Sequence, residues 1–204
     1  MNQAIELYLT KLRDKNTNRC KFQKAAHSIS DLLAQQALLH LKTKTVSIQT
    51  PIAPTTGIEL TDEIVLVPIL RSGITMVPAF LNYFPGAAIG VVGLKRDEKT
   101  AIAHLYYNNL PPLNKYQQII ILDPMIATGG TAVETLKLLK ENGIHEDKIL
   151  FVAIVSAPEG INTILTSFPG ITIITASEDE KLNDKKLIVP GLGDFGDRYF
   201  GTLE

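Results

Sequence analysis

The sequence predicts an α/β fold with an open, mostly parallel, twisted sheet flanked by helices. Short apolar runs rich in valine and isoleucine indicate strands, and they lack the polar alternation of a sheet with one solvated face. Helical patterns lie between several of these runs, and strand–helix–strand alternation is typical of doubly wound sheets. The predicted strands are residues 63–69, 87–93, 119–122, 149–155 and 171–175.

Two helices are predicted before the first strand. They cover residues 1–13 and about 19–41, where apolar side chains recur at helical spacing. Thr17 or Asn18 can cap the start of the second helix, because both side chains accept hydrogen bonds from free backbone N–H groups. Together these residues form an N-terminal helical region, residues 1–42.

The clearest helical pattern is residues 131–142. Val133, Leu136 and Leu139 line one side of it, as expected for a helix with one buried face. Gly143 follows at the position where a left-handed C-cap ends a helix. This helix joins two predicted buried strands, as a parallel sheet requires.

Three segments depart from the strand–helix alternation. Residues 43–57, with threonine and proline, are predicted to be a connector. Residues 95–116 are polar and aromatic and contain a Pro-Pro pair, so we expect an exposed loop or hairpin protruding from the sheet. The tail has four glycines within residues 191–201, too many for a helix or a plain strand. The 204 residues form a single domain, with no internal repeat or linker.

Composition excludes several classes of protein. The 20 Lys and Arg residues nearly cancel the 21 Asp and Glu residues, so a general nucleic-acid binder with a basic stripe is not expected. The single cysteine, Cys20, excludes an intrachain disulfide and fits a reducing, cytoplasmic compartment. The four histidines show no metal-ligand spacing, so no dedicated metal site is predicted.

Residues 74–94 carry no charge and are long enough to span a bilayer. However, Pro85-Gly86 is a strong turn signal in the middle of this stretch. We therefore expect a buried helix, a turn and a buried strand. The first residues lack the apolar core of a signal peptide, and a soluble protein is predicted.

The stretch most indicative of chemistry is "IIILDPMIATGGT", residues 119–131. A buried strand runs into Asp123, and a Thr-Gly-Gly-Thr turn then leads into a helix. Ligands of open α/β sheets bind where strands end and helices begin. Glycines let the backbone close around an anion, and the helix presents its positive end to the same place. The pattern therefore favours a phosphate-binding loop.

An ordinary strand–helix turn with glycines for tight packing explains the bare turn equally well. Asp123 favours a ligand, because a carboxylate at the end of a buried strand needs a hydroxyl, a metal or a cation. The GxxxxGK[ST] and GxGxxG patterns are absent, which argues against a nucleotide P-loop and a dinucleotide site.

The strand, the aspartate and "ATGGT" resemble the phosphoribosyl-diphosphate (PRPP) loop of type I phosphoribosyltransferases. Most of that superfamily has two adjacent acidic residues, whereas Pro124 occupies the second position here. This form is similar to the uracil phosphoribosyltransferase family. The segments "LRDKNT", "VPILRSG", "RDEKT", "APEG" and "VPGLGDFGDRYFGT" resemble that family's blocks in its order, and the resemblance covers nearly the whole chain.

The resemblance implies transfer of a phosphoribosyl group from PRPP to uracil, which gives UMP and diphosphate. The displacement at ribose C1 would pass through an oxocarbenium-like transition state. Mg²⁺ would arrive bound to PRPP. A cytoplasmic homodimer or higher homo-oligomer is implied, with no nucleic-acid or membrane partner, and whether GTP activates it stays open.

The resemblance also implies roles for individual residues. Asp123, Arg71 and Arg96 would be catalytic, with Asp123 at the ribose and both arginines on diphosphate. Residues 176–204 would form a small C-terminal base-binding hood. PRPP would be bound by Arg71, Arg96, Asp123, Pro124, Met125, Ile126, Ala127, Thr128, Gly129, Gly130, Thr131 and Asp194, and uracil by Ile188, Gly193, Asp194 and Phe195.

Each of these roles has a structural alternative. Arg71 can instead pair with a helix end, Arg96 can be a solvated loop charge, and the glycine-rich tail can be a tight loop packed on the core. No general base for N1 of uracil is evident in the sequence.

Phe195 departs from the family, which usually has alanine there. Its ring can narrow the base pocket or point outward, so we expect Phe195→Ala to leave folding unchanged and to alter uracil KM or base choice. The N-terminus is also shorter than is usual in the family.

Three other hypotheses are weighed. A nucleotide-sensing RNA-binding regulator on this fold would need a basic face. A purine-type phosphoribosyltransferase would carry paired acidic residues, and Pro124 argues against it. An inactive relative is disfavoured because Arg71, Arg96, Asp123 and Asp194 are present.

Overall fold

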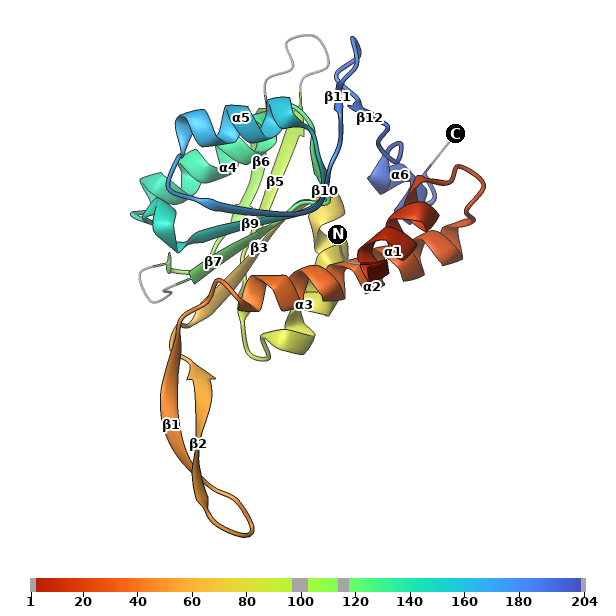
Figure 1. The fold of residues 1–204 in the computed structure, drawn as a ribbon. Coiled ribbons are helices and arrows are strands. Elements are labelled where there is room, and N and C mark those ends of the chain that lie inside the picture. Colours follow the sequence, from red (N-terminus) through yellow and green to blue (C-terminus); the bar gives the residue numbers. More distant parts are fainter. Residues whose placement is uncertain (1–2, 97–102, 114–117, 203–204) are drawn as a thin grey trace.

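A computed structural model describes residues 3–96, 103–113 and 118–202 of the chain. Its centre is an eight-stranded sheet with the order β10-β9-β7-β3-β5-β6, in which the short strands β4 and β8 pair with β3 and β9 (Figure 1). All pairs are parallel except β5 with β6. The strands are β3 (Ile64–Leu70), β4 (Ala88–Ile89), β5 (Val91–Arg96), β6 (Ala103–Asn109), β7 (Gln118–Leu122), β8 (Met125–Ile126), β9 (Ile149–Ser156) and β10 (Thr172–Glu178).

Both faces of the central strands are buried, which explains their continuous apolar runs. Every residue of β7 and β9 is buried. Alternation along β7 sends Ile120 and Leu122 to one core and Ile119 and Ile121 to the other. The predicted mostly parallel α/β sheet is therefore confirmed.

Helices cover the two faces of the sheet. The core on one face contains side chains of α1 (Gln3–Arg13), α2 (Arg19–Leu38) and α3 (Val77–Tyr83). The core on the other face contains side chains of α4 (Gly130–Glu141) and α5 (Pro158–Ser167). The predicted helices are thus present, with α2 ending before residue 41.

The predicted caps are found at both tested helix ends. The side chain of Asn18 accepts a hydrogen bond from the N–H of Lys21 and caps α2. Gly143 has φ +81° just after α4, as a left-handed glycine cap requires.

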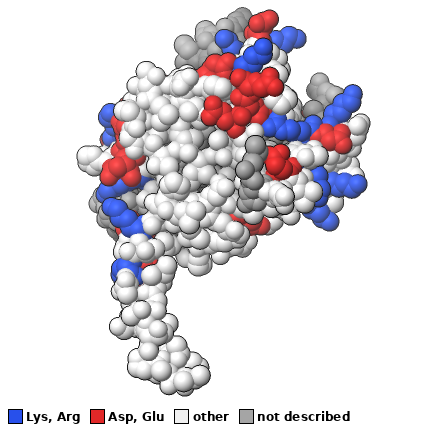
Figure 2. Space-filling view, in the orientation of Figure 1, with Lys and Arg blue, Asp and Glu red and all other residues white. Residues whose placement is uncertain are grey.

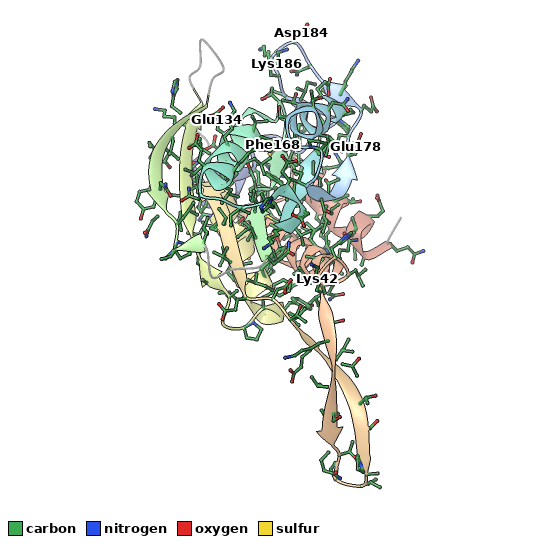
Figure 3. The ribbon with its side chains drawn as sticks, turned by 90° about the vertical axis from the view of Figure 1, so that its left-hand side faces the viewer. Lys42, Glu134, Phe168, Glu178, Asp184 and Lys186 are labelled. Atoms are coloured by element: carbon green, nitrogen blue, oxygen red, sulfur yellow. The ribbon has the colours of Figure 1, made fainter. Side chains whose placement is uncertain are left out.

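Residues 43–57 are not a connector, and that prediction is wrong. β1 (Thr43–Gln49) and β2 (Pro54–Leu60) form an antiparallel hairpin that projects from the body of the molecule (Figure 1). We call residues 43–60 the β-arm, and Lys42 lies at its root (Figure 3). None of its residues is buried. Its sequence therefore lacks the regular alternation of apolar and polar residues by which a half-buried strand is recognised.

The uncharged stretch folds as expected. A 3₁₀-helix, η1 (Ser72–Met76), leads into α3, and a turn at Pro85-Gly86 precedes β4. Among the described residues, no helix has the length and apolar content needed to cross a bilayer. Part of the polar segment 95–116 is strand β6, paired with β5, while residues 97–102 and 114–117 lie outside the described structure.

The chain ends in a small C-terminal unit, residues 179–202, which lies beside α1 and α2 and shares their core (Figure 1). It contains a two-stranded hairpin with Asp184 and Lys186 near its tip (Figure 3). A short helix follows the hairpin and packs against α2. Its elements are β11 (Lys181–Leu182), β12 (Ile188–Val189) and α6 (Phe195–Phe200). A further short 3₁₀-helix, η3 (Glu146–Lys148), lies outside this unit, before β9.

Candidate active site

The candidate site lies at the carboxyl ends of β3 and β7, which are adjacent parallel strands. Their register pairs Pro68 with Leu122, so the residues that follow each strand emerge side by side. From β3 the chain moves to β5 on one side, and from β7 it moves to β9 on the other. Such a reversal of direction opens a crevice where ligands of α/β sheets bind.

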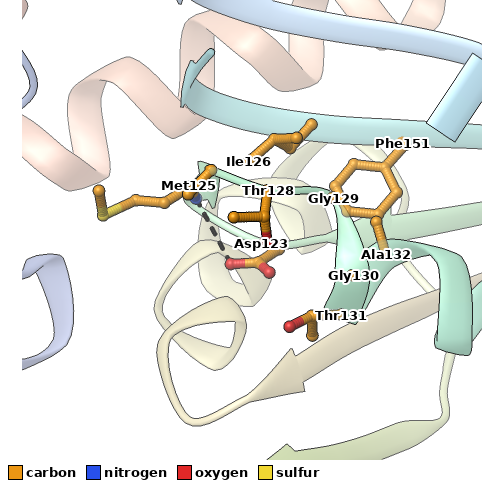
Figure 4. Close-up of a pocket in the computed structure, with 10 residues that line it drawn as sticks. Asp123, Met125, Ile126, Thr128, Gly129, Gly130, Thr131, Ala132 and Phe151 are labelled. Atoms are coloured by element: carbon orange, nitrogen blue, oxygen red, sulfur yellow. Dashed lines mark hydrogen bonds between the residues drawn. The ribbon is translucent and has the colours of Figure 1, made fainter. Parts of the chain in front are cut away.

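The loop after β7 surrounds a small cavity (Figure 4). Residues 123 and 125–132 line it together with Phe151 of β9. Gly129 has φ +80° and is the N-cap of α4. The first hydrogen bond of this helix is donated by the N–H of Val133 to the carbonyl of Gly129, at 2.9 Å. The preceding N–H groups have no partner within the helix and suit an anion.

The two glycines of this loop have different surroundings. A Cβ on Gly129 would lie 2.7 Å from the carbonyl oxygen of Gly160 in α5, so part of its role is close packing. A Cβ on Gly130 would approach only the Thr128 hydroxyl, at 3.8 Å. Close packing and a positive φ therefore both require glycine at position 129, whereas Gly130 borders open space.

Asp123 lies at the floor of this cavity (Figure 4). Its Oδ1 accepts a long hydrogen bond, 3.4 Å, from the N–H of Met125. The residue as a whole keeps some exposed surface, but its carboxyl group is surrounded by protein, and this desolvation raises its pKa to about 7. The ligand-free carboxyl group is thus poised between its neutral and charged forms near neutral pH.

Arg71 follows β3 and is exposed. Its Nη2 donates to Oδ1 of Asp197 at 3.2 Å and to Oγ1 of Thr202 at 3.4 Å. Its guanidinium also lies 4.9 Å from the ring centre of Phe200, a cation–π distance. Arg71 therefore links the turn after β3 to helix α6, and its contacts with Phe200 and Thr202 lie at the end of that helix, as in the structural alternative.

A backbone contact joins the Arg71 turn to the strand that carries Asp123. Gly73 packs against the carbonyl oxygen of Leu122 so closely that a Cβ at this position would overlap it. Only glycine fits here, because the obstacle is backbone rather than a movable side chain. The two predicted catalytic residues thus emerge from neighbouring, directly contacting backbones.

Arg96 is the last residue of β5, which pairs in parallel with β3. Its backbone therefore lies at the same edge of the sheet as Arg71 and Asp123. Its side chain is not among those that the structure describes.

The residues predicted to bind uracil lie in the C-terminal unit. Ile188 is buried in β12, and Gly193 is exposed with φ +80°. Asp194 is the N-cap of α6, and its side chain accepts a hydrogen bond from the N–H of Asp197 at 2.9 Å. Asp197, which the sequence did not single out, thus contacts both Asp194 and Arg71.

The ring of Phe195 points into the core and is 1% exposed. Its centre lies 5.3 Å from that of Phe22 in α2 and 5.7 Å from that of Tyr199. It neither points outward nor lines the cavity of Figure 4. The expectation that Phe195→Ala leaves folding unchanged does not fit these contacts, because the substitution would leave a cavity in the core.

The sequence analysis also missed Arg13, Asp179 and Arg198, which connect the C-terminal unit to the end of α1. Two of them lie within "LRDKNT" and "GDRYFGT", but no spacing pattern pairs residues so far apart in the chain. In the described parts of the chain, no three His, Cys, Asp or Glu side chains gather as a metal site would require.

Comparison with known proteins shows the family of this chain. The sequence profile described as uracil phosphoribosyltransferase matches residues 1–202. Proteins named uracil phosphoribosyltransferase are 45% identical in Campylobacter concisus, with 98% of this chain and 95% of that one covered, and 45% identical in Mycoplasma genitalium, with 95% and 93% covered. A solved structure of an Aquifex aeolicus protein is 34% identical, with a TM-score of 0.88 over 98% of this chain and 95% of that one. The chain belongs to the uracil phosphoribosyltransferase family.

Proposed function

We propose that the protein transfers the 5-phosphoribosyl group of PRPP to N1 of uracil and so produces UMP and diphosphate. The observation that carries this proposal is the presence of three features at the carboxyl ends of two adjacent strands. These are the anion-suited loop before α4, the carboxyl group of Asp123 and the cationic turn of Arg71. A sugar that bears a phosphate at one end and a diphosphate at the other needs all three.

In this proposal the 5-phosphate of PRPP lies in the loop of residues 127–131. The free N–H groups at the start of α4 donate to its oxygens, and the threonine hydroxyls add further donors. Asp123 then faces the ribose hydroxyls. Support comes from Gly130, where the absence of a side chain leaves space for a bulky anion.

The diphosphate group interacts with Arg71 and Arg96, whose guanidinium groups fork onto phosphate oxygens. Mg²⁺ enters as part of the substrate, bound to PRPP through diphosphate oxygens and water.

The displacement breaks the bond between ribose C1 and diphosphate oxygen, forms the bond from C1 to uracil N1 and releases the N1 proton. Positive charge develops on the ribose, and a fixed carboxylate beside it stabilises that charge. The pKa of Asp123, about 7, means that the approach of a cationic centre favours its ionised form. The negative charge of Asp123 then lies beside the ribose, where positive charge develops in the transition state.

Uracil is read by the C-terminal unit. Gly193 and Asp194 are exposed residues beside the buried Ile188, and backbone groups of this turn pair with the edge of the small planar base. Cytosine is disfavoured, because its amino group would meet a backbone donor and leave that donor unpaired.

The decisive experiment is turnover of Mg²⁺-PRPP with uracil, cytosine, hypoxanthine, guanine and orotate. We expect a nucleotide product with uracil alone. Arg71→Ala serves as the negative control, and Lys137→Ala, an exposed substitution in α4, as the active control. Nucleotide formation from hypoxanthine or guanine, or none from uracil, would disprove the proposal.

We also propose a homo-oligomer in which the β-arm packs on a second copy of the chain. A two-stranded hairpin is marginal in water by itself, yet this one exposes Ile48, Ile52 and Ile58 at 46%, 95% and 73%. Figure 2 shows the arm beyond its root without charged side chains, which suits an apolar interface. A second copy is the commonest partner of such a surface.

The oligomer is tested by light scattering of the Ile52→Asp, Ile58→Asp double variant. We expect a mass shift from oligomer to monomer. Leu187→Asp, at a residue that is 59% exposed in the C-terminal hairpin, is the matched control and should keep the wild-type mass. An unchanged mass in the double variant would remove the arm from the interface.

A cytoplasmic location and activation by GTP remain part of the proposal. The lone cysteine and the phosphorylated substrates fit a reducing compartment. Turnover at subsaturating PRPP, with and without GTP, tests the activation directly, and GDP and ATP are the controls.

A further inference from the structure

Two arginines connect helix α1 and the C-terminal unit in opposite directions. Arg13, at the end of α1, donates from Nη1 to the carbonyl of Gly191 at 2.9 Å. Arg198, in α6, donates to the carbonyls of Leu12 and of Asp14, the latter at 2.7 Å, and to that of Leu192 at 2.6 Å. The end of α1 and the turn before α6 are therefore held together from both sides.

Asp179 completes the first of these links. Its carboxylate accepts two hydrogen bonds from Arg13, at 2.6 and 2.8 Å, and its side chain is 1% exposed. It also accepts from the N–H of Gly191 at 2.8 Å and from the hydroxyl of Ser177 at 2.9 Å. Burial alone would raise the pKa of Asp179, but these hydrogen bonds and the Arg13 charge lower it, so the pair stays ionised.

Both polar groups of the Gly191 backbone are thus engaged by one ion pair. Arg13 binds its carbonyl and Asp179 binds its N–H. Gly191 has φ +63°, and a Cβ there would overlap the carbonyl oxygen of Ile188, so the turn from Ile188 to Gly191 is tight. The positions proposed to bind uracil, Ile188 and Gly193, lie on either side of the clamped residue.

We propose that Arg13 and Asp179 are a positioning pair for the uracil subsite. They fix the turn of residues 188–193 and thereby set the affinity for the base, without touching it. Neither side chain hydrogen-bonds to residues 123–131 in the described structure, so the pair has no direct side-chain contact with the PRPP loop. This inference rests on the proposed function, since it assigns the base-binding step to that turn.

A merely structural ion pair would change stability and affect both substrates alike. A positioning pair changes the KM for uracil and leaves the KM for PRPP near its wild-type value. Removing one partner of a buried ion pair leaves the other charge buried without a partner, which destabilises the fold. Conservative variants are therefore the informative ones. Asp179→Asn preserves shape, and Arg13→Lys preserves charge but cannot span the same acceptors.

The experiment measures steady-state kinetics of the full-length wild type, Asp179→Asn and Arg13→Lys. Uracil is varied at saturating PRPP, and PRPP at saturating uracil, below the melting temperature of each variant. We expect the KM for uracil to rise by about tenfold or more and the KM for PRPP to change by less than about twofold. Lys137→Ala is the control with an exposed ion pair removed.

Two results would overturn the inference. One is a wild-type KM for uracil in both folded variants, and the other is a parallel rise in both KM values. If Arg13→Lys does not fold, Asp179→Asn decides alone, and calorimetric binding of Mg²⁺-PRPP checks that its PRPP loop is intact. Wild-type protein that makes no UMP would instead disprove the proposed function itself, so the two failures are distinguishable.

Discussion

Arg71 Nη2 lies 3.2 Å from Asp197 Oδ1, and this contact joins the turn after β3 to helix α6. The pair is half exposed, so its direct contribution to stability is small. Its importance is positional, because Asp194 caps the same helix next to the residues proposed to bind uracil. The cation proposed for diphosphate and the segment proposed for the base therefore share one contact.

Arg71→Ala should lower kcat/KM for PRPP by about 100-fold or more, since a guanidinium on diphosphate stabilises the departing charge. Its exposure means that the melting temperature should stay near the wild-type value. Steady-state kinetics with varied PRPP and a thermal melt check this. Arg71→Lys should recover part of the rate, and wild-type kinetics in the alanine variant would exclude Arg71 from the mechanism.

Gly129→Ala and Gly143→Ala form a matched pair, because both glycines have φ near +80°. A Cβ at 143 meets nothing within 4 Å, whereas one at 129 meets the Gly160 carbonyl at 2.7 Å. Gly143→Ala should cost about 1 kcal/mol from backbone strain alone. Gly129→Ala should cost more and also raise the KM for PRPP.

Chemical denaturation and PRPP kinetics of both glycine variants test this. Equal losses of stability in the two variants would mean that α5 shifts to accommodate the methyl group added at position 129. An unchanged KM for PRPP in Gly129→Ala would argue against phosphate binding in this loop.

Asp123→Asn should change how stability depends on pH. The pKa of Asp123 is raised to about 7 in the folded protein, above the ordinary value of 3.8 that applies when unfolded. The folded state therefore holds a proton that the unfolded state releases, and wild-type stability falls as pH rises from about 4 to about 7. Asparagine cannot ionise, so the variant should gain relative stability over this window, by at most about 4 kcal/mol.

Unfolding free energies of wild type and Asp123→Asn at several pH values between 4 and 8 measure this difference. Curves that stay parallel would show that the carboxyl group is already ionised at low pH. The same variant should lose most of its turnover, because a neutral amide does not stabilise charge on the ribose.

Phe195→Ala should destabilise the protein by about 3–5 kcal/mol, the range for removing a buried aromatic ring. Phe195→Leu should cost less, because it keeps most of the volume. Urea unfolding measures both, and Leu39→Ala, at a side chain that is 84% exposed, is the control. A loss below about 1 kcal/mol in the alanine variant would mean that the surrounding rings collapse into the space.

The central strands of the sheet could be predicted from sequence because they are buried on both faces and so form continuous apolar runs. The β-arm could not, since Val46, Ile48 and Ile58 face no core and their spacing carries no such signal. A projecting hairpin is recognised in sequence only when its turn residues are distinctive, and "TPIAP" is not a two-residue glycine turn.

The candidate site also has parts that could be predicted from sequence and parts that could not. Asp123 and the loop of residues 127–131 follow directly from a strand, a turn and a helix that are contiguous in sequence. The contact of Arg71 with Asp197 and the pairing of Arg13 with Asp179 join residues more than 100 positions apart. The burial of the Phe195 ring could not be predicted, because the residues before it in sequence, Gly193 and Asp194, are exposed.

The overlap-limited contact between Gly73 and the Leu122 carbonyl has a consequence for protein engineering. It fixes the spacing between the ends of β3 and β7, at the crevice proposed to bind PRPP, through main-chain atoms that no rotamer change can adjust. Libraries aimed at altered sugar or base selection should therefore diversify the C-terminal unit and keep position 73 invariant, because any side chain there would pry apart the strands on which every variant depends.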